Sequence, residues 1–224
     1  MLDLSSLDLA SLETGLRGLA IGGFAATGAA LAASRRLNRT RWIGVAVFVC
    51  AIAHVTDSVH GGVHPNTLAW MLSVCAPGAF WLFTFSLFED APKLPSWGFV
   101  VPALGFVLWV LGALSAHTPF GVLVWRSFAF YSVAVVVHIL IIAWRGWRND
   151  LVDQRRRLRA PLATAAAGYM FVQALCDFGW SGRPVLPTIV QSAFLAALAI
   201  GGALALLRVE PLLVESSTVA GATP

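Results

Sequence analysis

Imidazole and carboxylate side chains recur at helical spacing in one apolar part of the chain. His54, Asp57, His60 and His64 follow one another at intervals of three, three and four residues. At 100° per residue, this spacing places all four on one face of a helix. Such a face could bind a small ligand or an ion, and His60 with His64 is a weak candidate for a zinc site. The same residues also fit a hydrated, polar helix end, so the spacing alone leaves both interpretations open.

Long apolar segments must position these side chains. Hydrophobic residues make up 58% of the 224 residues, and the mean hydropathy is +0.78. Charged residues reach only 12%, about half of the share of roughly 25% that is usual in soluble domains. Apolar runs of about 20 residues, long enough to cross the hydrocarbon core as helices, occur seven times, at 16–34, 42–60, 68–88, 97–115, 123–144, 161–180 and 188–207. The sequence therefore predicts an all-α polytopic membrane protein, a seven-transmembrane-helix bundle.

Basic residues predict which way the bundle faces. The connector at 145–159 carries six arginines, and connectors rich in Lys and Arg stay on the cytoplasmic side. With this connector inside, twelve of the fifteen Lys and Arg residues lie inside, and Arg17, Arg126 and Arg183 lie outside. We therefore expect an outer N-terminal segment over 1–14, a membrane domain over 15–208 and a cytoplasmic tail over 209–224. The connector is expected to anchor this topology on the anionic lipid of the inner leaflet. Its signature residues are Arg145, Arg148, Asp150, Arg155, Arg156, Arg157 and Arg159.

Polar side chains of the later spans fall at the same outer level as His54 in this topology. Each is costly within lipid unless it is paired or faces a cavity. We expect Asp57 or Asp177 to pair with Arg126 or Arg183, either to stabilise the bundle or to bracket a ligand. The candidate ligand-binding residues are His54, Asp57, His60, His64, Arg126, Tyr131, Asp177 and Gln191. His138, in the inner half of the fifth span, is expected instead to make a hydrogen bond between helices.

Two motifs carry a family resemblance. Residues 144–159 read WRGWRNDLVDQRRRLR, and residues 77–83 read PGAFWLF and lead to Phe88, Glu89 and Asp90. With them, the chain resembles the seven-helix N-terminal membrane domain of some AraC-type bacterial transcription regulators. The resemblance implies a bacterial inner membrane protein with a cytoplasmic C-terminus and a role in signal reception, and it supplies no catalytic residue. Only 16 residues follow Arg208, whereas a double helix-turn-helix domain needs on the order of 100, so we expect no direct nucleic acid contact.

The leading expectation is a sensor and signal-transducing domain that binds a small ligand or ion from outside and signals to a cytoplasmic output. Small residues in the first and seventh spans also permit a homodimer, and we expect no cofactor. The alternative is a metal-dependent intramembrane hydrolase, in which His60 and His64 help to hold zinc. A retinal protein is disfavoured because the only lysine, Lys93, lies in an inner connector. A haem held by His54 and His138 is disfavoured because the two residues lie at different depths.

Overall fold

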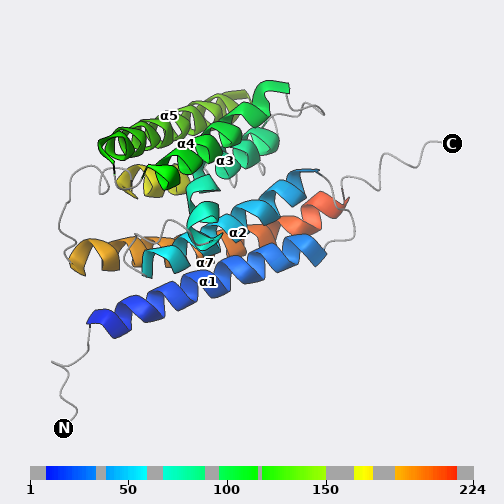
Figure 1. Ribbon diagram of the computed structural model, residues 1–224. Helices are drawn as coiled ribbons and strands as arrows, with labels where there is room; N and C mark the ends of the chain where they lie inside the picture. The colour runs from blue at the N-terminus through cyan, green and yellow to red at the C-terminus, as the bar shows by residue number, and fades with distance from the viewer. Residues whose placement is uncertain are drawn as a thin grey trace, which may run out of the picture.

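The protein is helical in almost all of the part of the chain that the computed structural model describes, apart from a turn at Ser115 and a bend at Thr118. This part comprises residues 9–33, 39–59, 68–88, 96–115, 118–149, 164–173 and 185–215. Its elements are α1 (Leu9–Ala33), α2 (Arg39–Val59), α3 (Leu68–Phe88), the 3-10 helix η2 (Ser96–Phe99), α4 (Val100–Leu114), α5 (Pro119–Asn149) and α7 (Val185–Glu215), and residues 164–173 are helical as well (Figure 1). The predicted all-α class is confirmed.

Four of these helices are long and apolar enough to cross a membrane. The apolar stretches are Leu9–Ala33, Arg39–Asp57, Leu68–Ser86 and Pro119–Arg145. Two further apolar stretches, Val100–Leu114 and Thr188–Leu204, are shorter. Each predicted span overlaps one helical segment, and the bounds of α3 coincide with the predicted 68–88.

The helices α1 and α7 extend beyond their predicted spans. α1 begins at Leu9 rather than at residue 16, and α7 ends at Glu215 rather than at residue 207. In the first turns of α1, Glu13 and Arg17 stand four residues apart and form an ion pair, which stabilises a helix. A span limit drawn by hydropathy excludes such charged turns, although the backbone continues as helix through them.

The first layer of the fold contains α1, α2 and α7 (Figure 1). Arg17 of α1 meets Val55 at the end of α2, whereas Gly28 faces Phe48, so these two helices are antiparallel. α1 and α7 are parallel instead. Glu13 bonds to Thr188 near the start of both helices, and Gly23 approaches Ala199 further along both.

The second layer contains α3, α4 and α5, and α3 packs on α2 of the first layer (Figure 1). α2 and α3 are antiparallel, since His54 meets Ser73 and Gly44 faces Phe83. Gly78 of α3 lets the backbone of α4 approach at Pro102, where an added Cβ would lie 2.7 Å from the Cα atom. Within α3, Pro77 occupies an interior position.

Residues 164–173 lie between the two layers, where the yellow helix is drawn in Figure 1. Ala167 belongs to the core of the second layer, around Trp81 and Ile139. Tyr169 belongs to the core of the first layer, and Met170 packs against both cores. This short segment therefore joins the two hydrophobic cores.

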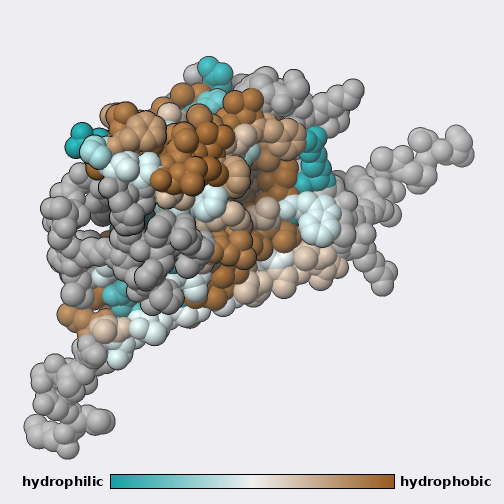
Figure 2. Space-filling model, in the orientation of Figure 1, coloured by the Kyte–Doolittle hydropathy of each residue, from teal (hydrophilic) through white to brown (hydrophobic). Residues whose placement is uncertain are grey.

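The surface of the bundle is apolar, as expected of a protein solvated by lipid. Leu68, Leu114 and Phe130 are 67%, 81% and 67% exposed. Brown, apolar side chains cover much of the face drawn in Figure 2. A soluble monomer rarely exposes contiguous apolar area on this scale. The exposed surface thus agrees with the four potential membrane helices.

The described arginines separate toward the two ends of the bundle. Arg39 and Arg41 begin α2, and Arg145 lies near the end of α5. α3 is antiparallel to α2 and parallel to α5, because Trp81 meets His138 while Trp70 meets Trp125. The start of α2 and the end of α5 therefore share one end of the bundle. Arg17 and Arg126 lie toward the other end, near the starts of α1 and α5.

Candidate functional site

A buried arginine joins three helices at the end of the bundle where α1 begins. Arg17 is only 6% exposed, and its Nε donates to Glu13 Oε1 at 2.9 Å. Its Nη1 donates to the carbonyl oxygen of Val55 on α2 at 3.1 Å. The other carboxylate oxygen, Glu13 Oε2, accepts from Thr188 Oγ1 on α7 at 3.2 Å. A guanidinium so deeply buried needs such partners, because an uncompensated charge in an apolar interior is strongly destabilising.

An imidazole of α2 adds two further segments directly beside this arginine. His54 Nδ1 lies 2.9 Å from Ser73 Oγ of α3, and His54 Nε2 lies 2.8 Å from the Tyr169 hydroxyl. The Tyr169 ring meets the imidazole edge-on, with centroids 6.0 Å apart. Val55, which accepts the hydrogen bond of Arg17, directly follows His54 in the chain. The contacts of Arg17 and of His54 therefore meet at adjacent positions of α2.

We call this set of residues the polar cluster; it contains Glu13, Arg17, His54, Ser73, Tyr169 and Thr188. The members come from α1, α2, α3, the helical residues 164–173 and α7. The cluster therefore ties five helical segments together with polar groups inside an apolar bundle.

The imidazole of the polar cluster can adopt two hydrogen-bond arrangements. In one arrangement, neutral His54 donates to Ser73 and accepts from the Tyr169 hydroxyl. In the other, His54 accepts from Ser73 and donates to Tyr169, whose hydroxyl then donates to Gln173 Oε1, 3.4 Å away. The two arrangements exchange by moving a proton between ring nitrogens and turning two hydroxyls. The polar cluster is therefore chemically able to respond to a neighbouring polar group or ion.

The sequence-derived candidates occupy different parts of the fold. His54 is a member of the polar cluster; Asp57 is half-buried one turn further along α2, and Gln191 is half-buried one turn beyond Thr188 on α7. Tyr131 and Arg126 belong to α5 in the other layer. His60, His64 and Asp177 lie outside the described residues.

Tyr131 serves the packing of the second layer. Its hydroxyl donates to the carbonyl oxygen of Val101 on α4 at 2.9 Å, and the side chain is 9% exposed. Gly105 of α4 makes room for the ring, since an added Cβ there would lie 2.9 Å from the Tyr131 hydroxyl oxygen. Arg126, five residues before Tyr131, is exposed.

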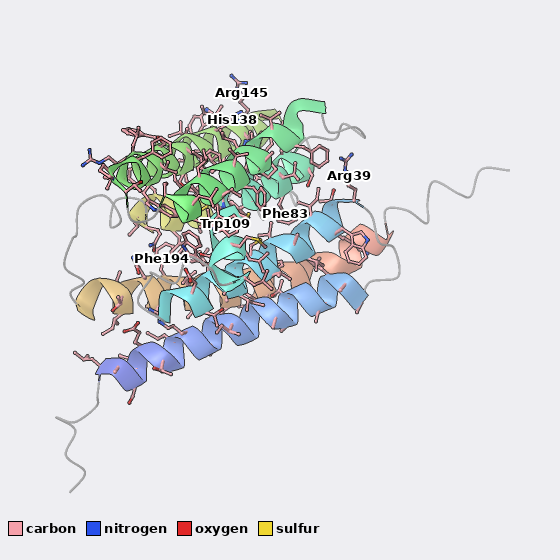
Figure 3. The ribbon with its side chains drawn as sticks, viewed as in Figure 1. Arg39, Phe83, Trp109, His138, Arg145 and Phe194 are labelled. Atoms are coloured by element: carbon pink, nitrogen blue, oxygen red, sulfur yellow. The ribbon has the colours of Figure 1, made fainter. Side chains whose placement is uncertain are left out.

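The signature connector is described only at its beginning. Arg145 is exposed near the end of α5, where Figure 3 shows its side chain pointing away from the bundle. Arg148 lies in the last turn of α5. Asp150, Arg155, Arg156, Arg157 and Arg159 fall outside the residues that the structure describes.

The expected helix-to-helix hydrogen bond of His138 is confirmed. Trp81 Nε1 of α3 donates to His138 Nδ1 of α5 at 2.8 Å, and the two ring centroids lie 5.7 Å apart. Trp81 is fully buried, whereas His138 is exposed at the surface of the bundle. His54 contacts Ser73 and Tyr169 whereas His138 contacts Trp81, so the two imidazoles bind different partners.

Comparison with protein families, curated proteins and solved structures finds no match for this chain. The geometry of its own residues therefore carries the functional argument, and the AraC-type resemblance stays a prediction. The zinc hypothesis also stays a prediction. Among the described residues no three His, Cys, Asp or Glu side chains are grouped as metal ligands, but His60, His64 and Asp177 are not part of that set.

Sequence reasoning missed most members of the polar cluster. The sequence prediction uses Arg17 only in the count of basic residues on each side of the membrane. Glu13, four residues earlier, indicates that the two residues can form an ion pair along a helix. Tyr169, one of only two tyrosines in the chain, was available as a polar residue in the sixth predicted span. Ser73 and Thr188 carry no comparable signal, because hydroxyls inside a span commonly bond to their own helix backbone.

Proposed function

We propose that this chain is a seven-helix sensor of the bacterial inner membrane, with its N-terminus outside and its C-terminus inside. In this role the polar cluster receives a small polar ligand or ion from the outer side, and α7 carries the response toward the cytoplasm. The single observation that supports the proposal most is the joining of five helical segments around His54 and Arg17.

The directions of the helices support seven crossings. α1, α3, α5 and α7 run one way and α2 and α4 run the other, as alternating crossings require. α4 has only 15 residues, but together with η2 it covers about 30 Å, which matches the hydrocarbon core. Arg39, Arg41 and Arg145 share one end, which the positive-inside rule assigns to the cytoplasm.

A sensor needs two states that a ligand can distinguish. The two arrangements of the His54 hydrogen bonds differ in which hydroxyls donate, so a bound ion or polar group would favour one of them. α7 leaves the polar cluster at Thr188 and extends to Glu215 at the opposite end of the bundle. A displacement of α7 at the polar cluster would thus move its other end, at the cytoplasmic side. The AraC-type resemblance favours a transcriptional output, delivered by a cytoplasmic partner.

Cysteine labelling tests the proposed orientation. In a background with Cys50, Cys75 and Cys176 replaced by alanine, a single cysteine is introduced at Ser11 or at Arg145. A membrane-impermeant maleimide should label Ser11→Cys in intact cells and Arg145→Cys only after permeabilisation. Labelling of both positions from the same side would refute seven crossings in this orientation.

The two tyrosines of the chain allow a matched test of ligand binding. The purified protein in lipid nanodiscs is titrated separately with an amino acid, a dicarboxylate and a divalent cation, and its unfolding midpoint is followed. Binding to the folded state raises the midpoint. Tyr169→Phe, which alters the polar cluster, should reduce that rise, whereas Tyr131→Phe, which removes a hydroxyl from the second layer, should preserve it. Equal reduction in both variants, or no rise with any probe in the unaltered protein, would contradict ligand binding at the cluster.

A further inference from the structure

A groove of about 230 Å³ opens on the surface of the second layer, between α3, α4 and α5. Its walls are mainly aliphatic, with Val101 and Leu104 on α4 and Ala134 and Val135 on α5. His138 also lines the groove. The groove faces the surroundings of the bundle, which are lipid hydrocarbon in a membrane protein. An aliphatic groove in this position fits a flexible hydrocarbon chain.

His138 brings a directed hydrogen-bond donor to this apolar groove. Its Nδ1 accepts the bond from Trp81 Nε1, so in the neutral ring the proton resides on Nε2. Trp81 is the only hydrogen-bond partner of this imidazole among the residues that the structure describes. The Nε2–H group therefore needs an acceptor from outside the described chain, because an unsatisfied donor is costly in hydrocarbon.

His138 lies about two turns inside the Arg145 end of the apolar stretch of α5, Pro119–Arg145. α4 and α5 are antiparallel and Tyr131 is bonded to Val101, so two turns further along α5 place His138 level with η2. At that level the Arg39 guanidinium carbon lies 5.4 Å from the centroid of the Phe99 ring. A charged side chain marks the depth of the lipid head groups. From His138 the groove extends toward Leu104, which is toward the middle of the bilayer.

Arg145 continues the same line on α5. It follows His138 by seven residues, which is about 10 Å along the helix and within about 20° of the same face. Side chains of a helix lean toward its N-terminus, so the guanidinium of Arg145 can reach back toward His138. Both residues are labelled on α5 in Figure 3. The order along the surface is therefore aliphatic wall, hydrogen-bond donor and cation.

We propose that this groove binds a phospholipid of the leaflet at the Arg39 and Arg145 end of the bundle. One acyl chain lies along Leu104 and Val135, a glycerol ester carbonyl accepts the hydrogen bond of His138 Nε2, and the phosphate lies beside Arg145. A phospholipid presents chain, ester and phosphate in the same order as the three parts of the groove. The proposal requires only that the helices span a membrane, and it depends neither on their orientation nor on ligand sensing.

Photo-crosslinking tests this lipid site. The full chain is reconstituted in phosphatidylcholine nanodiscs with a small fraction of phosphatidylglycerol that carries a diazirine on one acyl chain. After irradiation, the crosslinked peptides are quantified by mass spectrometry. Peptides of α4 and α5 that line the groove should carry the label, and unlabelled phosphatidylglycerol should compete for it.

Matched variants separate the groove from general contact with lipid. His138→Leu, which removes one hydrogen bond, should lower crosslinking in the groove about 3- to 10-fold. Leu104→Trp should fill the groove and nearly abolish crosslinking, whereas Leu111→Trp, seven residues further along α4, should leave it unchanged. Arg145→Gln should reduce the advantage of phosphatidylglycerol over phosphatidylcholine as competitor several-fold, whereas Arg126→Gln should not.

Two results would overturn the proposal. Crosslinking that is equal in the unaltered protein, His138→Leu and Leu104→Trp would mean that the groove contacts only the lipid that surrounds any membrane helix. Competition by an isoprenoid quinone but not by phosphatidylglycerol would assign the groove to a different ligand. The Arg145→Gln substitution lies at an exposed position, so it tests the phosphate contact even if a groove substitution impairs folding.

Discussion

Replacing Gly23 by alanine should force α1 and α7 apart. A Cβ atom added at Gly23 would lie 2.8 Å from Ala199 Cβ and 3.4 Å from the Ala199 carbonyl carbon. Non-bonded carbon atoms are at their optimum at about 3.5–4.0 Å, so the two helices must separate by about 1 Å. The contact between Glu13 and Thr188, already 3.2 Å long, joins the same helices and would be stretched.

The expected magnitude follows from two opposing effects. Overpacking of a well-packed contact typically destabilises by about 1–3 kcal/mol. Alanine is the better helix former and offsets about 0.5–1 kcal/mol of this loss. Gly23→Ala should therefore reduce the free energy of unfolding by about 0.5–2 kcal/mol. Gly22 has nothing within 4 Å of an added Cβ, so Gly22→Ala should be neutral or slightly stabilising.

Equilibrium unfolding in mixed micelles measures this difference. The protein in a mild detergent is titrated with sodium dodecyl sulfate, and tryptophan fluorescence follows the loss of packing. The double substitution Gly23→Ala with Ala199→Gly removes the added contact and should recover most of the lost stability. If Gly23→Ala proves as stable as Gly22→Ala, the close parallel approach of α1 and α7 is wrong.

Three further substitutions test other contacts by the same unfolding assay. Gly78→Ala places a Cβ 2.7 Å from the backbone of α4 and should reduce the free energy of unfolding by about 1–3 kcal/mol. Gly168→Ala, with nothing within 4 Å of the added Cβ, should not destabilise the protein. Similar free energies of unfolding for both variants would contradict the packing of α3 on α4. Ser73→Ala removes one partner of His54 and should cost about 1 kcal/mol, and an unchanged midpoint would exclude that bond. Glu13→Gln keeps the shape but removes the charge opposite a buried guanidinium, so a loss of about 1–3 kcal/mol is expected; no loss would show that the ion pair is dispensable.

The sequence predicts the elements of this fold well, because their signal is local. A run of apolar residues long enough for the bilayer identifies a helix without knowledge of its neighbours, and α3 matches its predicted bounds. The extra turns at the start of α1 were missed because hydropathy does not register a helical ion pair such as Glu13 with Arg17.

The candidate site could be predicted only in part, because its contacts join residues far apart in the chain. His54 was found from its spacing, but its partners Ser73 and Tyr169 lie 19 and 115 residues away. Periodicity reports which side chains share a face of one helix and says nothing about the helix opposite. Periodicity likewise predicts Tyr131 as a member of the outer polar group, because it does not show the helices opposite. In the structure, Gly78 of α3 and Gly105 of α4 leave room for the Tyr131 side chain between these two helices.

The proline inside α3 has a mechanical consequence for this arrangement. Pro77 has no N–H group, so the carbonyl oxygen of Ser73, four residues earlier, lacks its usual helical donor. Ser73 is also the residue through which α3 is bonded to His54. α3 therefore bends most readily near Ser73, the residue that is bonded to α2 of the first layer. A bend of α3 at this point would change the contact between α3 and α2, because Ser73 Oγ lies 2.9 Å from His54 Nδ1.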